Sequence, residues 1–368
     1  MILNKKKKLR IIIGSLNVGG TEKQLIKIVN ALSKKNWKIE IITLQEKGIL
    51  NKYLNKKIVS NNLNIKSSFK LIKLIKITYK LVKIFKKNPS TLTHFFLPQA
   101  YIIGMISSII SQAKCKLIMS RRSLNLYQNK NFLYKTIERL LHKKVNKILV
   151  NSNVIRKQLI NEEKVNKNKI KLIYNGVSVN NKKIKKKNNF NIVIIANLIP
   201  YKNHRILLKS LELIKDKLPK NWKLYCIGRD DGIKKELIKL SNQLSISKNI
   251  IWVETLKLKN ILSNCKIGIL CSKEEGFPNA ILEYFASKLP VITSNVGGCK
   301  EIVKNKKNGL IIEKNNSVKL SKAIFYLYKN EKIAKKFGIE GYNNVASKYT
   351  LEKTINKHEK EYLNCLKP

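Results

Sequence analysis

Short apolar runs alternate with amphipathic segments along the whole chain. The first run, at 9–16, has the continuous apolar character of a strand that is buried on both faces of a parallel sheet. A glycine-rich turn follows, then a predicted helix at 21–35 and a second predicted strand at 37–45. Thr21 and Gln24 have the spacing of a capping box at the start of that helix. This strand–helix–strand order predicts a βαβ unit.

The same alternation continues to the end of the chain and is interrupted once. The lysine-rich stretch 178–189 has no apolar periodicity and is predicted to be a linker. We therefore expect two Rossmann-like, doubly wound α/β domains, with ligands bound beyond the carboxyl ends of the strands in a cleft between the two halves. Further predicted strands lie at 91–97, 115–120, 146–152, 169–177, 190–198, 222–229, 249–254, 266–272, 289–295 and 309–313. Further predicted helices lie at 67–88, 100–112, 132–145, 153–163, 203–218, 233–245 and 351–366.

Composition adds a large positive charge to this picture. The 368 residues include 76 Lys and Arg against 22 Asp and Glu, a formal net charge of +54. This charge indicates either a polyanionic partner or compositional drift, since Lys, Ile and Asn crowd every segment alike. In either case the surface attracts anionic lipid headgroups.

Cysteine usage and hydropathy indicate a reducing compartment. The six cysteines form no C-x-x-C pair and have no zinc spacing, so we expect buried free thiols. The basic N-terminus precedes an apolar run that Gly14 breaks, and no signal peptide is expected. No apolar stretch approaches the length of a membrane span. We therefore expect a cytoplasmic protein, peripheral at the inner face of the membrane.

Several residues at predicted strand ends could carry chemistry. Gly19 and Gly20 stand before a helix, where backbone N–H groups favour an anion, although a plain turn would look the same. Lys202 follows a strand of the second half, where an ammonium could stabilise a departing diphosphate, but it is one of many basic residues. His94 sits at the end of a first-half strand and is either a sugar contact or a core histidine. Arg121 and Arg122 could bind phosphate on the acceptor side, or only add to the general basicity.

The segment 274–298 carries the strongest signal. Pro278 disfavours helix before it, so a helix should begin near Asn279, with Glu275 in the preceding loop and Glu283 in its first turn or just beyond. Glu283 faces away from the stripe of Ile281 and Phe285, and it is either a solvated surface residue or a ligand for ribose hydroxyls. Adjacent Asp residues at 230 and 231 are not an Asp-x-Asp motif, and no cluster of His, Cys or carboxylate residues has metal spacing. We therefore expect no metal and no cofactor.

Read in order, these motifs resemble the retaining GT-B glycosyltransferases of group 1 (glycosyltransferase family 4). The resemblance is carried by the Gly19–Gly20 turn with Glu22, 151–159, 173–177, 197–208, 227–232 and above all 271–303. It implies a hexosyltransferase-type enzyme with an N-terminal acceptor domain at 1–178 and a nucleotide-sugar domain at 188–345. It also implies a closing helix at 346–368 that crosses back to the first domain.

The resemblance assigns a role to each matching residue. Glu283 would bind the ribose, Glu275 would face the transferred sugar, and Lys202 would neutralise the diphosphate. The backbone at Phe277 and Pro278 would lie near the phosphates, next to Asn279, and His94 would contact the sugar.

One position departs from the family pattern. The family often has Arg where this chain has Asn197, so Arg229 or another base would have to supply the missing cation. The implied partners are a UDP- or GDP-linked sugar, a lipid-linked or glycan acceptor and an anionic membrane surface, in the synthesis of a cell-surface polysaccharide such as lipopolysaccharide or capsule. The alternatives are a nucleotide-sugar epimerase of the same fold and a polyanion-binding protein. No nucleic-acid recognition motif supports the latter.

Overall fold

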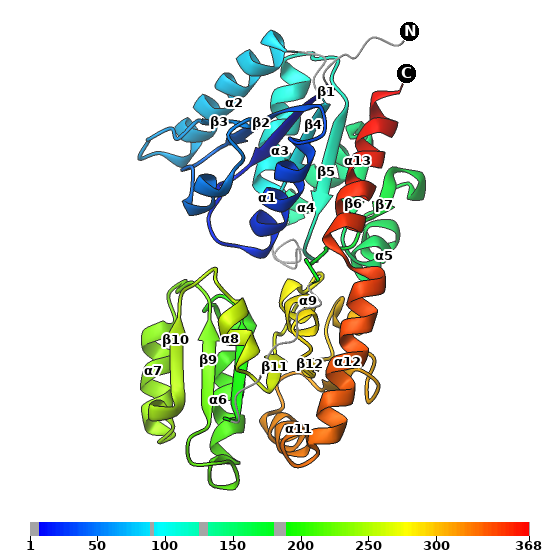
Figure 1. Ribbon diagram of the computed structural model, residues 1–368. Coiled ribbons are helices and arrows are strands. Elements are labelled where there is room, and N and C mark those ends of the chain that lie inside the picture. The colour runs from blue at the N-terminus through cyan, green and yellow to red at the C-terminus, as the bar shows by residue number, and fades with distance from the viewer. Residues whose placement is uncertain (1–6, 89–91, 125–131, 180–188, 368) are drawn as a thin grey trace. The chain divides into compact units, whose positions relative to one another are not determined.

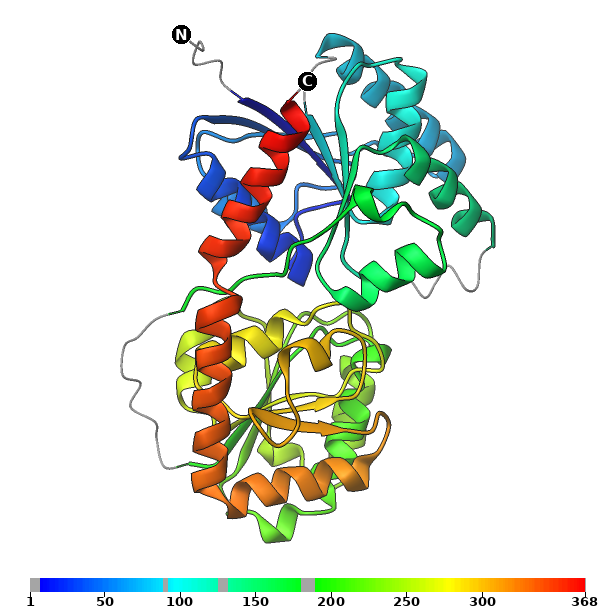
Figure 2. The same ribbon diagram turned by 90° about the vertical axis from the view of Figure 1, so that its right-hand side faces the viewer.

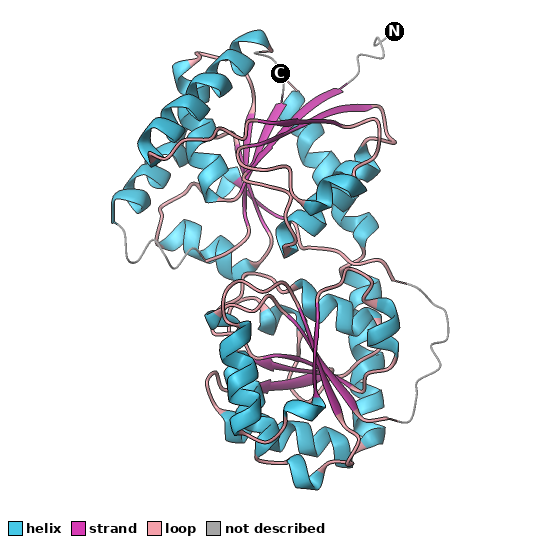
Figure 3. Cartoon of the chain, turned by 90° about the vertical axis from the view of Figure 1, so that its left-hand side faces the viewer, coloured by secondary structure: helices cyan, strands magenta, loops and turns pink. Residues whose placement is uncertain are grey.

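Two compact units make up the chain in the computed structural model, which describes residues 7–88, 92–124, 132–179 and 189–367. Unit 1 comprises residues 1–175 together with 352–368, and unit 2 comprises 176–351. The predicted linker 178–189 falls almost entirely outside the described residues. Each unit is built from one parallel sheet with helices on both of its faces (Figures 1, 2 and 3). The two Rossmann-like, doubly wound α/β halves expected from the alternation are confirmed.

The sheet of unit 1 has seven strands in the order β3-β2-β1-β4-β5-β6-β7, and every neighbouring pair is parallel. Most of its strands coincide with the predicted apolar runs, because burial on both faces requires such runs. The edge strand β3 was missed, since its sequence is short and polar. The strands are β1 (Lys7–Ile13), β2 (Trp37–Thr43), β3 (Val59–Asn62), β4 (Leu92–Phe96), β5 (Leu117–Arg121), β6 (Lys147–Val150) and β7 (Ile170–Leu172).

Within the described residues, six helices complete unit 1. α5 is capped by Ser152, whose side chain accepts a hydrogen bond from the backbone N–H of Ile155. The capping box expected at Thr21 was wrong: α1 begins one residue earlier, with Gly19 as its N-cap and no side-chain cap. The helices are α1 (Gly20–Leu32), α2 (Lys70–Lys87), α3 (Pro98–Ile110), α4 (Phe132–Lys144), α5 (Asn153–Asn161) and α13 (Leu351–Leu366).

The sheet of unit 2 has six parallel strands in the order β10-β9-β8-β11-β12-β13. Successive strands are added on one side of β8 up to β10 and then on its other side from β11 onward. The loops after β8 and β11 therefore diverge at the carboxyl ends of these strands, where ligands bind in such folds. The strands are β8 (Asn191–Ile195), β9 (Lys223–Ile227), β10 (Ile250–Val253), β11 (Ile267–Leu270), β12 (Val291–Ser294) and β13 (Gly309–Ile312). The helices are α6 (His204–Glu212), α7 (Lys234–Gln243), α8 (Lys259–Ser263), α9 (Asn279–Ala286), α10 (Cys299–Ile302), α11 (Ser317–Lys329) and α12 (Glu331–Lys348).

Two further expectations concern cysteines and membrane spans. All six cysteines are free thiols, and five of them are buried, as predicted. Among the described helices, none combines the length with the apolar character that crossing a bilayer requires.

Candidate functional site

The residues with the strongest sequence signal meet inside unit 2, at the carboxyl ends of β8, β9 and β11. Lys202 ends the short 3-10 turn Pro200–Lys202 that follows β8, and Glu275 lies in the loop between β11 and α9. The Lys202 ammonium and Glu275 Oε1 form an ion pair at 2.6 Å. Ser272 Oγ donates a second hydrogen bond to the same carboxylate oxygen, at 2.7 Å. The structure therefore joins the two residues that were assigned separately to the diphosphate and the sugar.

This ion pair is largely removed from water. The side chains of Lys202 and Glu275 are only 17% and 9% exposed. Burial alone would lower the pKa of Lys202, but the adjacent Glu275 carboxylate raises it, and the net result is a pKa above the ordinary value. The ammonium consequently keeps its proton, and its charge, throughout the neutral range.

Hydrogen bonds to backbone carbonyls fix the loop after β11 against the loop after β8. The N–H of Lys273 donates to the carbonyl of Tyr201, and the Cys271 thiol donates to the carbonyl of Asn203 at 3.3 Å. On the other side, Gly297 has φ +44°, and a Cβ there would overlap the carbonyl oxygen of Glu275. Only glycine permits both this conformation and this close approach.

Helix α9 begins at Asn279, where the sequence placed it, but its N-cap is Pro278 and no side chain caps it. The helix is fixed by Tyr284, whose hydroxyl accepts from the N–H of Ile195 at 2.6 Å and donates to the carbonyl of Ile269 at 3.0 Å. Phe277 is buried and its ring packs against that of Tyr349. Glu283 is half-buried on the outward side of α9, as its spacing predicted.

A second polar group lies at the ends of β8 and β9. Arg229 Nε donates to Asp231 Oδ1 at 2.6 Å, and Asn197 Nδ2 donates to Asp231 Oδ2 at 3.1 Å. Asn197 Oδ1 also accepts from the backbone N–H of Arg229. A cation therefore stands directly beside Asn197, although an aspartate partly balances its charge.

Other residues proposed from the sequence stand elsewhere. Gly19 is the N-cap of α1, and the Glu22 carboxylate occupies the place that a Gly19 Cβ would take, so the chain already supplies a negative group at this helix start. Gly20 is the first residue of that helix.

His94 has no surface exposed for a ligand, contrary to the expected sugar contact. It lies in the middle of β4 with no exposed surface. Its Nδ1 is 2.8 Å from Tyr362 Oη, and its Nε2 is 2.9 Å from Ser120 Oγ. Burial, together with nearby His358 and Arg122, holds the pKa of His94 well below its ordinary value. It is a neutral core residue.

Arg121 is a structural residue and not a phosphate ligand. Its guanidinium, 1% exposed, pairs with Glu138 at 2.8 Å and with Glu163 at 2.6 Å. Arg122 is half-buried and donates to Asn175 Oδ1 at 2.5 Å, and burial lowers its pKa to about 10. Neither contact was visible from the SRRS motif, because the acceptors are distant in sequence.

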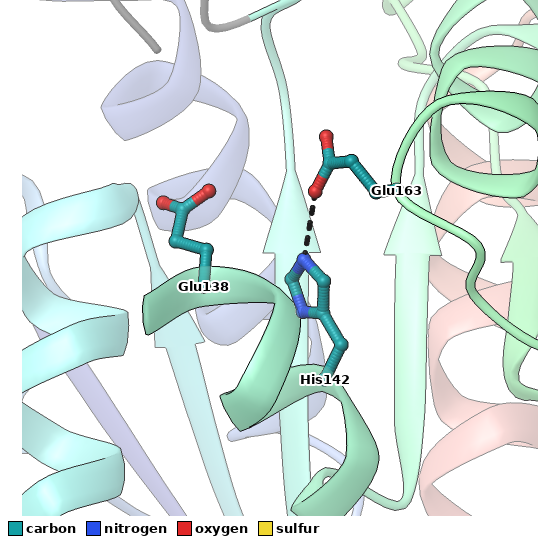
Figure 4. A group of neighbouring side chains, drawn as sticks. All are labelled: Glu138, His142 and Glu163. Carbon is teal, nitrogen blue, oxygen red and sulfur yellow. Dashed lines mark hydrogen bonds and ion pairs between the residues drawn. The ribbon is translucent and has the colours of Figure 1, made fainter. Parts of the chain in front are cut away.

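The carboxylates around Arg121 belong to a cluster that contradicts one expectation. The sequence indicated no group with metal spacing, yet Glu138, His142 and Glu163 bring three possible ligand atoms within 4.8 Å of one another (Figure 4). His142 Nε2 is 3.0 Å from Glu163 Oε2. Arg121 already bonds both carboxylates, so its guanidinium supplies the positive charge that a metal would bring. The sequence could have indicated that Glu138 and His142 are buried together, because they share the apolar stripe of their helix with Leu141 and Val145.

Sequence reasoning also passed over His204, the first residue of α6, two positions after Lys202. It is 1% exposed, and within the described part of the chain neither ring nitrogen has a hydrogen-bond partner. Burial, followed by the charge of Lys202, lowers its pKa to about 4. Its spacing from Leu207, Leu208 and Leu211 already placed it on the buried stripe of α6.

Comparison with known proteins identifies related enzymes. A capsular polysaccharide biosynthesis glycosyltransferase, CapM of Staphylococcus aureus, is 25% identical over 360 residues, covering 92% of this chain and 93% of the relative. A UDP-Gal:alpha-D-GlcNAc-diphosphoundecaprenol alpha-1,3-galactosyltransferase of Escherichia coli is 22% identical, covering 95% of each chain. These names favour a transferase over the epimerase alternative.

Solved structures share the fold. The Anabaena protein Alr3699/HepE, in complex with UDP and glucose, superposes with a TM-score of 0.83 at 19% identity and covers 97% of this chain and 99% of its own. TarM of S. aureus superposes with a TM-score of 0.80 at 16% identity, covering 98% of this chain and 100% of the TarM chain.

Family models match both halves of the sequence. The model for Glycosyltransferase Family 4 matches residues 18–181, and the model for Glycosyl transferases group 1 matches 178–344. Together the two matches run from residue 18 to residue 344 and include every strand of the two sheets except β1. The chain therefore belongs to the group 1 glycosyltransferases and is a hexosyltransferase-type enzyme of the GT-B fold.

Proposed function

We propose that this enzyme transfers a hexose from a UDP-linked donor, or a GDP-linked one, to a lipid-linked glycan, with retention of the anomeric configuration. The reaction would serve the synthesis of a cell-surface polysaccharide at the cytoplasmic face of the membrane. Two observations support a UDP-sugar and a lipid-linked acceptor: the name of the E. coli relative and the UDP found in similar structures. The observation that carries the proposal is the enclosed Lys202–Glu275 pair at the strand ends of unit 2.

The pair has the chemistry that a departing nucleoside diphosphate requires. As the bond between the anomeric carbon and the β-phosphate oxygen breaks, the electron pair leaves with the diphosphate. The Lys202 ammonium, largely shielded from water, would stabilise this growing negative charge more than the charge of the ground state. The acceptor hydroxyl would form the new C–O bond on the same face and pass its proton to the leaving phosphate oxygen.

The neighbouring residues would position the donor. Glu275 uses Oε1 for Lys202 and Ser272, and we assign its Oε2 to a hydroxyl of the transferred sugar. Glu283 would accept from the ribose hydroxyls, and the Phe277–Asn279 backbone would face the phosphates at the start of α9. Arg229, next to Asn197, would supply the second cation of the diphosphate site. No metal or cofactor is needed in this assignment.

Substitution of the pair tests the proposal. Lys202→Met should lower kcat/KM by about 100-fold or more, whereas Lys209→Met on the exposed side of α6 should leave kcat/KM unchanged. Glu275→Gln keeps a hydrogen-bond acceptor and should fold normally with reduced turnover. Because Lys202→Met leaves a buried carboxylate unpaired, the double variant Lys202→Met/Glu275→Leu should regain thermal stability without regaining activity.

The ribose and the stereochemistry need separate measurements. Glu283→Ala should weaken donor binding, and full turnover in both the Lys202 and the Glu283 variants would remove this site assignment. A panel of UDP- and GDP-sugars should identify the donor, since a bound donor raises the melting temperature by mass action. An inverted anomeric configuration in the isolated product would overturn the retaining mechanism.

A further inference from the structure

Helix α2 carries an apolar stripe that the fold leaves exposed. Its buried stripe consists of Ile77, Leu81 and Phe85, which enter the core of unit 1. None of the residues of its first two turns is buried. The large apolar side chains that remain exposed at and after the helix start are Phe69 (69%), Leu71 (70%), Ile72 (43%), Leu74 (39%), Ile75 (60%) and Tyr79 (59%).

Four of these side chains form one face of the helix. At 100° per residue, Leu71, Ile72, Ile75 and Tyr79 fall within a sector of about 100°. This sector adjoins the buried stripe on one side. On its other side it adjoins a sector that holds most of the lysines of the helix. The lysines of α2 are Lys70, Lys73, Lys76, Lys80, Lys83, Lys86 and Lys87, and the helix has no acidic residue.

We infer that α2 is the element through which the enzyme docks on an anionic lipid bilayer. An apolar face bordered by lysines is the pattern of a helix that lies in the membrane interface, with its apolar side chains among the acyl chains and its ammonium groups at the phosphates. Long lysine side chains can lay their methylenes along the apolar face while the charge stays at the headgroups. The Lys83 ammonium already stands 4.4 Å from the centre of the Tyr79 ring.

The positive charge of α2 argues against a second copy of this chain as the partner of its apolar stripe. A second copy of this chain docked through α2 would bring two lysine-rich faces together, and no acidic residue of the helix could balance them. Exposed apolar residues of unit 2, such as Val318 and Ile339, lie on separate helices and lack this continuous stripe. The surface is therefore matched to a negatively charged, apolar partner, which a bilayer with anionic headgroups provides.

This inference rests on the proposed lipid-linked acceptor, but its test needs neither donor nor acceptor. The full-length protein is sedimented with vesicles of phosphatidylcholine alone, or of phosphatidylcholine mixed with phosphatidylglycerol. The wild type should bind the mixed vesicles. Leu71→Ser/Ile75→Ser, which leaves the charge unchanged, should lower the partition coefficient by about tenfold. The matched control Val318→Ser/Ile339→Ser replaces exposed apolar residues of unit 2 and should bind like the wild type.

A second pair of variants separates α2 from the overall charge. Lys76→Gln/Lys80→Gln/Lys83→Gln and Lys239→Gln/Lys332→Gln/Lys336→Gln remove the same charge from α2 and from unit 2. Only the first triple variant should lose vesicle binding. Equal losses in both, or full binding by Leu71→Ser/Ile75→Ser, would mean that net charge alone drives the contact and would overturn the inference. So would a lipid-free dimer that the Leu71→Ser/Ile75→Ser change dissociates. If the wild type binds the mixed vesicles but transfers no sugar to a lipid-linked acceptor, that result would count against the proposed function only.

Discussion

A neutral histidine stands two residues from the proposed diphosphate cation. His204 is buried at the start of α6, and within the described residues its two ring nitrogens have no hydrogen-bond partner. Protonating this ring would place a second positive charge next to Lys202 without any compensating bond. This is why the pKa of His204 falls to about 4, with burial as the main cause.

The lowered pKa of His204 predicts acid-sensitive stability of unit 2. In the unfolded chain His204 takes up a proton near pH 6.5, whereas in the fold it does so only near pH 4. Stability linked to this group is therefore complete above pH 6.5 and is lost as the pH falls to about 4, by up to about 3 kcal/mol. His204→Leu should remove this part of the pH dependence and should not destabilise the protein at pH 7, because it also removes two unpaired polar atoms.

Thermal unfolding of His204→Leu and the wild type between pH 7.5 and pH 4.5 checks this. The difference in melting temperature should grow in favour of the variant as the pH falls. Parallel curves would show that His204 is not the group responsible.

The sequence predicts where a residue lies when the motif around it is local. It does not predict the role of a residue whose partners are distant in the sequence. The positions of Glu275 and Glu283 on either side of the start of α9 follow from Pro278 and helical spacing alone. His94 lies in the middle of β4 and not at its end, and its partners come from distant segments. Arg121 does stand at the end of β5, but distant carboxylates already bind its guanidinium. Tyr362 is 268 positions away from His94, a distance over which no local pattern carries information.

At the scale of elements, the loop between β11 and α9 is positioned by the turn after β12. Gly297 approaches the backbone of Glu275 so closely that a Cβ would overlap its carbonyl oxygen, and its φ of +44° is unfavourable for other residues. The N–H of Gly298 also donates to the carbonyl of Gly276, at 3.1 Å. The Glu275 carboxylate therefore stays beside Lys202 only while position 297 lacks a side chain.

Gly297→Ala should displace this loop and inactivate the enzyme. The strained φ and the overlap together should destabilise unit 2 by about 2 kcal/mol or more, and the loss of turnover should exceed what this destabilisation explains, because Glu275 is moved. Gly232→Ala is the matched control: it also has a positive φ, +108°, but a Cβ there meets nothing within 4 Å. The test measures the turnover and the melting temperature of both variants. If the two variants lose activity equally, the close approach at Gly297 has no role in positioning Glu275.

Buried elements were easier to predict than exposed ones. Strands β1, β8 and β11 were recognised because a parallel sheet covered on both faces requires unbroken apolar runs. Strand β3 has no such run, since it is an edge strand with half-exposed and exposed residues, and its sequence is polar. Helix α2 was predicted as a helix, but its exposed apolar stripe becomes apparent only when burial separates it from the stripe that enters the core.

At the scale of the whole chain, the last helix belongs to the unit formed by the first half of the sequence. Tyr362 of α13 has no exposed surface and contacts the rings of Trp37 and His94. Trp37 Nε1 donates to Glu359 at 3.2 Å, and Lys35 pairs with the same carboxylate at 2.7 Å. Unit 1 is therefore built from two separate stretches of the sequence, and the fold of its first stretch depends on residues that follow unit 2.

Removing the Tyr362 side chain should unfold unit 1 preferentially. Tyr362→Ala should destabilise this unit by about 3–5 kcal/mol, because a large buried ring leaves a cavity. Tyr362→Phe should cost about 1–3 kcal/mol, since it keeps the ring and leaves His94 Nδ1 without its partner. Leu366→Ala, at a partly exposed position of the same helix, is the control and should change stability by no more than about 0.5 kcal/mol.

The protein offers its own reporter for this measurement. Trp37 lies in unit 1, against Tyr362, whereas Trp222 and Trp252 lie in unit 2. In a Trp222→Phe/Trp252→Phe background, denaturant unfolding followed by Trp37 fluorescence reports unit 1 alone. The Tyr362→Ala transition should move to lower denaturant, while thermal stabilisation by the nucleotide-sugar donor, which the proposed function assigns to unit 2, should persist. If the Trp37 transition does not move, α13 only covers a surface and contributes nothing to the core, and the first half of the chain should then fold without the last helix.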